Sequence, residues 1–211
     1  MGGGSADEII MTSTSNPSVM AICYAQGWAA NADYMTKREA EAVSSIGTVF
    51  KGKTAITSFT EFQYFTGVNS IAREGFRGCS GMTEITLPNS IRSIGQSAFQ
   101  SCGNLTSFTV NEGCTSTGQQ WIWACSKIVL IEFPSTITSL TGYGIQPYKT
   151  KHISYNVKIY ATTPPSLGNS SYAIGLQGIY VPDNSVDAYK AKSVWSDLAA
   201  KIKPLSEYIP S

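Results

Sequence analysis

Hydrophobic and polar positions recur every 23 residues through the middle of the chain. Apolar side chains return at fixed positions, as Phe76, Phe99 and Ile122 do. A coil of this length cannot bury its own apolar edge, so the pattern predicts coils that stack into a solenoid with one continuous core. The copies that begin at residues 67, 90 and 113, and a fourth that begins at 136 and then loses phase, read GVNSIAREGFRGCSGMTEITLPN, SIRSIGQSAFQSCGNLTSFTVNE, GCTSTGQQWIWACSKIVLIEFPS and TITSLTGYGIQ.

Each copy divides into two halves with different patterns. One half alternates inward and outward residues, which is typical of a strand, and stacked copies predict a parallel β-ladder. These strand segments read MTEITL, LTSFTV and IVLIEF. The other half, IGQSAFQSC in the second copy, is short and helix-leaning, with Ile94, Phe99 and Cys102 turned inward. The predicted fold class is therefore an α/β solenoid.

An array of this kind exposes apolar faces at both ends and needs caps. Asn16 followed by Pro17 predicts the start of one helix near the N-terminus. Thr36 and Glu39 have the spacing of a capping box, which predicts a second helix. Near the C-terminus, IYVPDNSVDAYKAKSVWSDLAAKI predicts a strand followed by a helix that covers the last coil.

The chain thus divides into four predicted parts. Residues 1–15 are expected to be a flexible tail or a tag, because they begin with MGGGS. A helical N-terminal cap over 16–55, the repeat solenoid over 56–158 and a C-terminal cap over 159–211 follow.

Composition and charge exclude several classes of partner. Charged residues make up 14% of the chain and the net charge is +1, so no basic stripe is present to recruit nucleic acid. No run of about 18 apolar residues occurs, so no membrane span is expected. The start of the chain lacks the basic and apolar regions of a signal peptide.

Three of the five cysteines, Cys79, Cys102 and Cys125, share one phase of the repeat. We expect them to form a structural ladder of buried thiols that act as small hydrophobic side chains. The odd number of cysteines argues against a complete disulfide framework. Their spacing fits no zinc site, and His152 is the only histidine, so no metal site is expected.

Motifs for catalysis are missing from the sequence. There is no G-x-S-x-G nucleophile elbow, no phosphate-binding loop and no dinucleotide fingerprint, so neither catalytic residues nor cofactors are expected. Glycoside hydrolysis would need two carboxylates that flank one bond. Glu84 and Glu132 are the only acidic residues at outward phases of the predicted strands. They lie two coils apart, about 10 Å by strand spacing.

Two surfaces are candidates for binding. The first is the outward face of the strands, whose residues stack in three rows. They are Thr83, Thr106 and Val129; Glu84, Ser107 and Leu130; Thr86, Thr109 and Glu132. The second is Trp123, which shares its phase with the polar residues Arg77 and Gln100. Trp123 is either an exposed anchor for a partner or is buried, with Trp121, by the irregular segment TGYGIQPYKTKHISY.

The repeat resembles a known family. The pattern I-x-x-I-G-x-x-A-F-x-x-C-x-x-L-x-x-I-x-L-P is nearly complete from Ile91 to Val110 and resembles the BspA-like bacterial leucine-rich repeat. The C-terminal segment is similar to the closing module of such arrays in surface proteins of gut and oral anaerobes. The resemblance extends over roughly residues 56 to 205. It implies a short right-handed array that is secreted or displayed at the cell surface and serves adhesion or recognition without catalysis.

We therefore expect a monomeric module that binds a protein or a glycan at the bacterial cell surface. The sequence departs from the family pattern in its short array, its degenerate third copy and the absence of a visible export signal. These departures leave a structural or assembly module, in a phage particle or a surface complex, as the alternative. A carbohydrate-active enzyme is the remote alternative.

Overall fold

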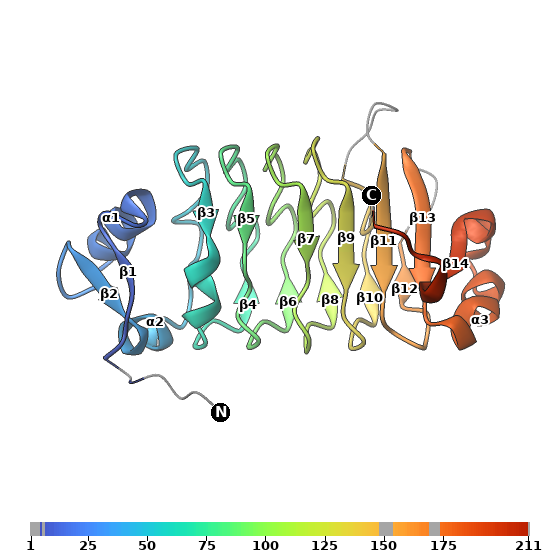
Figure 1. Ribbon diagram of the computed structural model, residues 1–211, viewed down its shortest axis with the longest axis horizontal. Coiled ribbons are helices and arrows are strands. Elements are labelled where there is room, and N and C mark those ends of the chain that lie inside the picture. The colour runs from blue at the N-terminus through green and yellow to red at the C-terminus, as the bar shows by residue number, and fades with distance from the viewer. Residues whose placement is uncertain (1–4, 6, 148–153, 169–173, 211) are drawn as a thin grey trace.

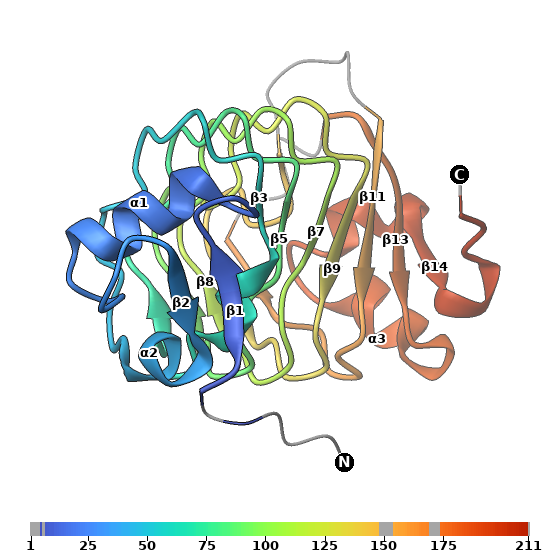
Figure 2. The ribbon, with the colours of Figure 1, turned by 60° about the vertical axis from the view of Figure 1, so that its left-hand side comes forward.

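The chain forms a stack of coils that is closed at each end by helices (Figure 1), as the computed structural model of residues 5, 7–147, 154–168 and 174–210 shows. The N-terminal helices cover the first coil, and the C-terminal helices cover the last (Figures 1 and 2). Parallel strands follow one another along the stack, so the predicted α/β solenoid is confirmed.

One side of the stack carries the predicted parallel strands, which we call the strand face. Five of them form one continuous parallel sheet in the order β14-β13-β11-β9-β7, and β3 pairs separately with β5. Their bounds are β3 (Ser58–Phe59), β5 (Glu84–Ile85), β7 (Ser107–Thr109), β9 (Leu130–Phe133), β11 (Tyr155–Ile159), β13 (Leu176–Val181) and β14 (Ile202–Pro204).

A second parallel ladder, which the repeat pattern did not predict, runs along the opposite side of the coils. The half of each repeat that was expected to lean toward helix forms this ladder and a series of turns instead. The strands are β4 (Ser70–Ile71), β6 (Ser93–Ile94), β8 (Ser116–Thr117), β10 (Ser139–Leu140) and β12 (Ser166–Leu167).

A column of aromatic rings runs through the core. The rings of Phe50, Phe76 and Phe99 stack in sequence, with centroids 5.2 and 5.1 Å apart and interplanar angles of 12° and 6°. Trp121 continues the column edge-on, 6.4 Å from Phe99. All four side chains are fully buried. Because Phe50 belongs to this column, the first coil begins inside the segment 16–55 that was assigned to the helical cap.

Left-handed residues recur at two corners of the coils. One set comprises Glu74, Ser97, Gln120 and Tyr143, and the other comprises Gly78, Ser101 and Ala124, with φ between 54° and 77°. Such a conformation is strained for residues other than glycine. In compensation, corner N–H groups donate to carbonyls of the next coil, as Glu74 does to Gln96 (3.0 Å) and Ser101 to Trp123 (2.8 Å).

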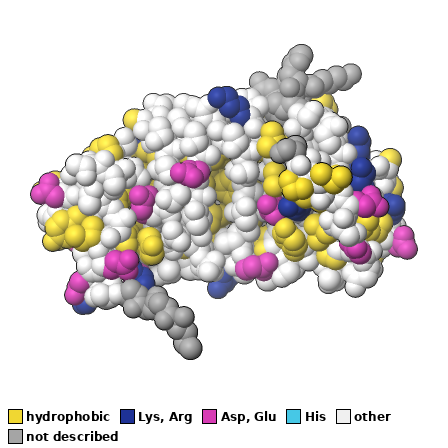
Figure 3. All heavy atoms as spheres, viewed as in Figure 1, with side chains coloured by type: hydrophobic (Ala, Val, Ile, Leu, Met, Phe, Trp, Pro, Cys, Tyr) yellow, Lys and Arg dark blue, Asp and Glu magenta, His cyan; other side chains and the backbone are white. Residues whose placement is uncertain are grey.

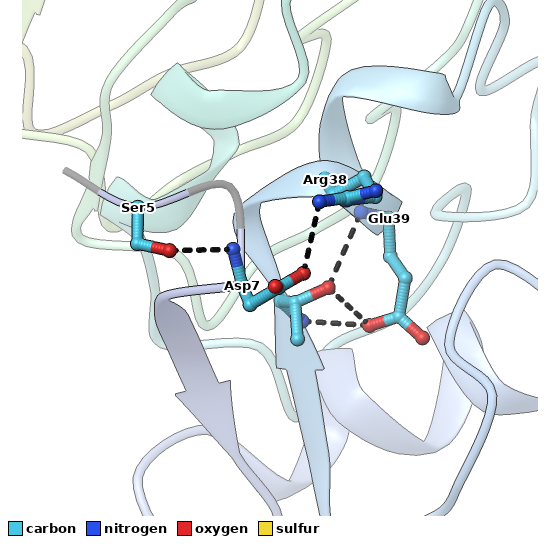
Figure 4. A network of polar contacts seen from close by, with 5 residues as sticks. Ser5, Asp7, Arg38 and Glu39 are labelled. Atoms are coloured by element: carbon cyan, nitrogen blue, oxygen red, sulfur yellow. Dashed lines mark hydrogen bonds and ion pairs between the residues drawn. The ribbon is translucent and has the colours of Figure 1, made fainter. Parts of the chain in front are cut away.

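The N-terminal cap combines helices with a small antiparallel sheet. Its elements are β1 (Ile9–Thr12), α1 (Pro17–Ala25), β2 (Tyr34–Thr36) and α2 (Lys37–Ala42). The expectation of a flexible tail over 1–15 is wrong for β1, which pairs with β2. The predicted capping box is confirmed, because the side chains of Thr36 and Glu39 each bind the other's backbone N–H. Figure 4 shows this box and the adjacent ion pair between Arg38 and Asp7, 3.2 Å long.

Asn16 precedes α1 as predicted, but its side chain does not cap the helix. Its Nδ2 donates instead to the carbonyl of Ser58 (3.0 Å) and to the carboxylate of Glu61 (3.2 Å). Asn16 therefore fastens the cap to the first coil through a hydrogen bond to β3.

The C-terminal cap closes the other end through two buried aromatic residues. The Tyr189 hydroxyl donates to the carbonyl of Ala161 (2.9 Å), and Trp195 Nε1 donates to that of Pro165 (2.8 Å). Tyr189 lies in α3 (Val186–Ala191). The 3₁₀ helices of the chain are η1 (Thr60–Tyr64), η2 (Asp183–Ser185), η3 (Ser196–Lys201) and η4 (Leu205–Glu207).

The left-handed corners predict an unusual response to glycine. Ala124→Gly should stabilise the protein by about 0.5–1 kcal/mol, because glycine relieves the strain at φ 62° by more than it costs in chain entropy. The matched change Ala188→Gly, at an exposed position of α3, should destabilise by about 1 kcal/mol. Urea denaturation of the two variants measures both effects. A loss of stability in Ala124→Gly would contradict the strain argument.

Candidate functional site

The strand face exposes most of the residues that the sequence analysis singled out. The side chains of Thr83, Glu84, Thr86, Thr106, Ser107 and Thr109 are all exposed. The register of β7 and β9 places Ser107 opposite Leu130 and Thr109 opposite Glu132. These two rows are therefore continuous between the two coils.

The half of the strand face that begins at β9 is occupied by contacts within the chain. Glu132 accepts a hydrogen bond from the Tyr160 hydroxyl (2.7 Å) and lies 3.7 Å from Lys158 Nζ. The Lys158 ammonium in turn lies 3.9 Å from the centre of the Tyr208 ring. Tyr208 belongs to the C-terminal segment, which crosses this end of the face (Figures 1 and 2). Glu132 therefore serves intramolecular contacts.

Apolar side chains also gather at that end. Val129 is 48% exposed, and Leu130 is half-buried. Figure 3 shows hydrophobic side chains grouped over the C-terminal strands, whereas the surface over β5 and β7 is mainly polar and uncharged. The strand face therefore has two chemically distinct halves.

The open half contains a groove between β5 and β7, with a volume of about 310 Å³. Its lining residues are Thr83, Glu84, Ile85, Thr86, Leu87, Asn89, Ser107, Thr109 and Asn111. Five of these were predicted candidates, and Thr106 lies outside the lining. Asn89 and Asn111 were not among the predicted candidates, because both lie beyond the alternating segment that marks the strand.

The second candidate surface is more covered than the strand face. Trp123 is half-buried and its ring packs against Tyr143, with centroids 5.3 Å apart. Trp121 is fully buried. The interpretation that buries both tryptophans therefore holds in full for Trp121 only. His152, in the same irregular segment, lies outside the described residues.

The polar neighbours of Trp123 have different surroundings. Arg77 pairs with the carboxylate of Glu74, which also binds Lys51. Hydrogen bonds from Lys51 and Arg77 hold the pKa of Glu74 below its usual value. Gln100 is half-buried, and its carbonyl accepts the N–H of Gly78 (2.8 Å). Arg77 is thus engaged in an ion pair within the chain.

Glu84 and Glu132, the two carboxylates considered for glycoside hydrolysis, bind side chains that lie on opposite sides of them. Glu84 accepts a hydrogen bond from the Ser58 hydroxyl (2.8 Å) of β3, on one side. Glu132 binds Tyr160 and Lys158 on the other side, and β7 lies between them. Such an arrangement does not place two carboxylates on one glycosidic bond. Among the described residues, no three histidine, cysteine or acidic side chains gather as a metal site.

The three cysteines of the ladder are buried, and all five cysteines of the chain are unbonded thiols. Each ladder thiol also makes a hydrogen bond that the sequence analysis did not anticipate. It donates from Sγ to the carbonyl of a phenylalanine in the preceding coil. The pairs are Cys79 with Phe50 (3.0 Å), Cys102 with Phe76 (3.2 Å) and Cys125 with Phe99 (3.2 Å).

Burial predicts thiols that react only after unfolding. A thiol reacts as thiolate, and burial raises the pKa of Cys23 to about 12 and that of Cys114 to about 11. Hydrogen bonding to Cys125 and burial raise the pKa of Cys102 as well. We expect no reaction with Ellman's reagent near pH 8 in the folded protein, and five thiols per chain in guanidinium chloride. Rapid reaction of any thiol in buffer would contradict the buried ladder.

Comparison with known proteins places this geometry in a family. A model described as the BspA type leucine rich repeat region matches residues 48–170 in six copies, which is more than half of the 211 residues. The match begins before Phe50 and so includes the coil that the sequence analysis assigned to the cap. No match is found among curated proteins.

Two solved structures can be aligned with this chain, and the first of them shares its fold. A leucine rich cell surface protein from Faecalibacterium prausnitzii A2-165 has a TM-score of 0.55 and 23% identity over 72% of this chain. The present chain corresponds to 39% of the length of that protein. A leucine rich repeat protein from T. pallidum has a TM-score of 0.46 and 16% identity, with 74% of each chain covered. In the described part of the present chain, no helix is long and apolar enough to cross a membrane.

Proposed function

Because the chain belongs to the BspA-type leucine-rich-repeat family, we propose that it is a non-catalytic binding module that recognises a protein or a glycan at the bacterial cell surface. The observation that carries the proposal is the open, hydroxyl-rich half of the strand face around β5 and β7. The fold shared with a leucine rich cell surface protein of F. prausnitzii supports the location.

A rigid platform with uncommitted polar groups suits recognition. The hydroxyls of Thr86, Ser107 and Thr109 form no hydrogen bond within the described part of the chain, so their donors and acceptors remain available to a ligand. The strands beneath them are short segments of a packed stack, which keeps these groups in fixed relative positions. Binding through such groups depends on hydrogen bonds rather than on charge.

An assembly module is the second candidate, because apolar side chains are grouped over the C-terminal half of the strand face (Figure 3). Val129 is 48% exposed and Ile209 is 82% exposed. Exposed apolar side chains that cluster on one surface are typical of contacts with another protein. On this interpretation the solenoid acts as a spacer and the C-terminal half of the strand face docks to a neighbour.

A binding screen with matched variants tests the proposal. The purified protein is measured against glycan arrays, mucins and host matrix proteins. Ser107→Arg places a bulky cation on the strand face and should lower the affinity for a ligand of this face at least about tenfold. Ser126→Arg adds the same side chain at an exposed turn outside the strand face and should leave binding unchanged. Trp123→Ala should also bind like the unaltered protein.

Other outcomes would redirect or reject the proposal. Loss of binding in Trp123→Ala, with Ser107→Arg unaffected, would move the site to the second surface. Absence of any ligand at tens of micromolar, where weak recognition is still measurable, would reject the binding module in favour of the assembly module.

A further inference from the structure

The parallel ladder of the strand face is interrupted between β5 and β7. Within the described strands, β5 pairs only with β3, and β7 pairs only with β9. The facing edges of β5 and β7 therefore carry backbone donors and acceptors that no neighbouring strand uses. The groove lies at this interruption.

The interruption is confined to the strand face. On the opposite side, β4 pairs with β6 in the regular register. At the corners, the N–H groups of Glu74 and Phe76 donate to the carbonyls of Gln96 (3.0 Å) and Ala98 (2.8 Å) in the next coil. The two coils therefore stay at their normal separation. The opening cannot admit another strand, which would need about 4.8 Å on each of its sides.

The floor of the groove is apolar and partly accessible. Ile85 is half-buried, whereas its counterparts Phe108 and Ile131 in the next two coils are 3% and 0% exposed. The walls carry the free hydroxyls of Ser107 and Thr109. A ligand therefore meets an apolar surface below and hydroxyl groups at the sides.

Asn111, at one end of the lining, has an unused acceptor. The residue is 9% exposed, and its Nδ2 donates to the carbonyls of Ile91 (3.0 Å) and Glu112 (2.9 Å). Its Oδ1 is buried without a hydrogen-bond partner. Because this oxygen is shielded from solvent, a ligand in the groove would meet the exposed hydroxyls of Ser107 and Thr109 rather than Oδ1.

The charge of the groove narrows the class of ligand. Glu84 is the only charged residue of the lining, and one of its oxygens is held by Ser58. A carboxylate disfavours anionic ligands, such as uronic or sialic acids. The volume of about 310 Å³ lies at the lower end of small-molecule sites, which begin at about 300 Å³.

We propose that this groove binds a single neutral sugar ring, so that the ligand of the strand face is a glycan that presents a neutral hexose. One face of a hexose ring carries C–H groups that suit Ile85, and its hydroxyls both donate and accept, as the side chains of Ser107 and Thr109 require. The inference rests on the proposed function, because it names the ligand class of the same face.

A titration with simple sugars tests the groove directly. Methyl glycosides of glucose, galactose, mannose and N-acetylglucosamine are added to ¹⁵N-labelled protein, with methyl glucuronide as the anionic comparison. We expect saturable chemical-shift changes confined to residues 83–89 and 107–111 for at least one neutral sugar. Methyl glucuronide should bind more weakly.

A matched pair of variants separates the groove from the rest of the face. Thr109→Val removes a hydroxyl of the lining while keeping the shape of the side chain, and should lower the affinity for the sugar about tenfold. Thr106→Val makes the same change at an exposed residue outside the lining and should have no effect. Unchanged thermal unfolding of both variants shows that each is folded.

The outcomes distinguish this inference from the proposed function. If neutral sugars shift residues elsewhere, or if Thr109→Val binds like Thr106→Val, the groove is not the site and the inference is overturned. If no sugar binds but a protein ligand is found on the strand face, the inference fails and the proposed function stands. If neither sugars nor proteins bind, both fail.

Discussion

The structure depends on one constraint, which is that each coil can bury its apolar edge only against the next coil. The stacked rings of Phe50, Phe76 and Phe99 meet this constraint in the core. The ladder thiols and the left-handed corners follow from the same stacking, because each directs a hydrogen bond from one coil to its neighbour. The strain at a corner residue such as Ser97 is therefore offset by contacts that exist only in the stack.

The candidate site arises where this stacking is satisfied without a complete strand ladder. The aromatic column, the second ladder and the corners hold the coils of β5 and β7 at their regular spacing. The coils therefore stay together although the strand face lacks ladder hydrogen bonds between β5 and β7. The opposite side and the core of the coils keep the groove rigid, whereas the strand face makes it accessible to a ligand. Because the groove is preformed, binding does not have to order it.

Reasoning from the sequence predicted the structural features that repeat with the 23-residue period and missed features that this period does not encode. It identified the solenoid, the parallel strands of the strand face and the capping box at Thr36. It missed the coil of Phe50, because the spacing from Phe50 to Phe76 is 26 rather than 23 residues and no cysteine marks that coil. The second ladder escaped notice because its two-residue strands are too short for alternation to show. The left-handed corner at Ala124 was missed because no glycine marks it. The break in the ladder between β5 and β7 was missed because their segments, MTEITL and LTSFTV, have the same alternating pattern.

The two halves of the strand face have different consequences for recognition. The C-terminal half contains the charged residues Glu132 and Lys158, but they bind each other and the aromatic side chains of Tyr160 and Tyr208. The open half carries Glu84 as its one charged lining residue. Long-range attraction can therefore contribute little to the capture of a ligand there. Affinity must come from short-range hydrogen bonds and apolar contact in the groove, and such binding changes little with ionic strength.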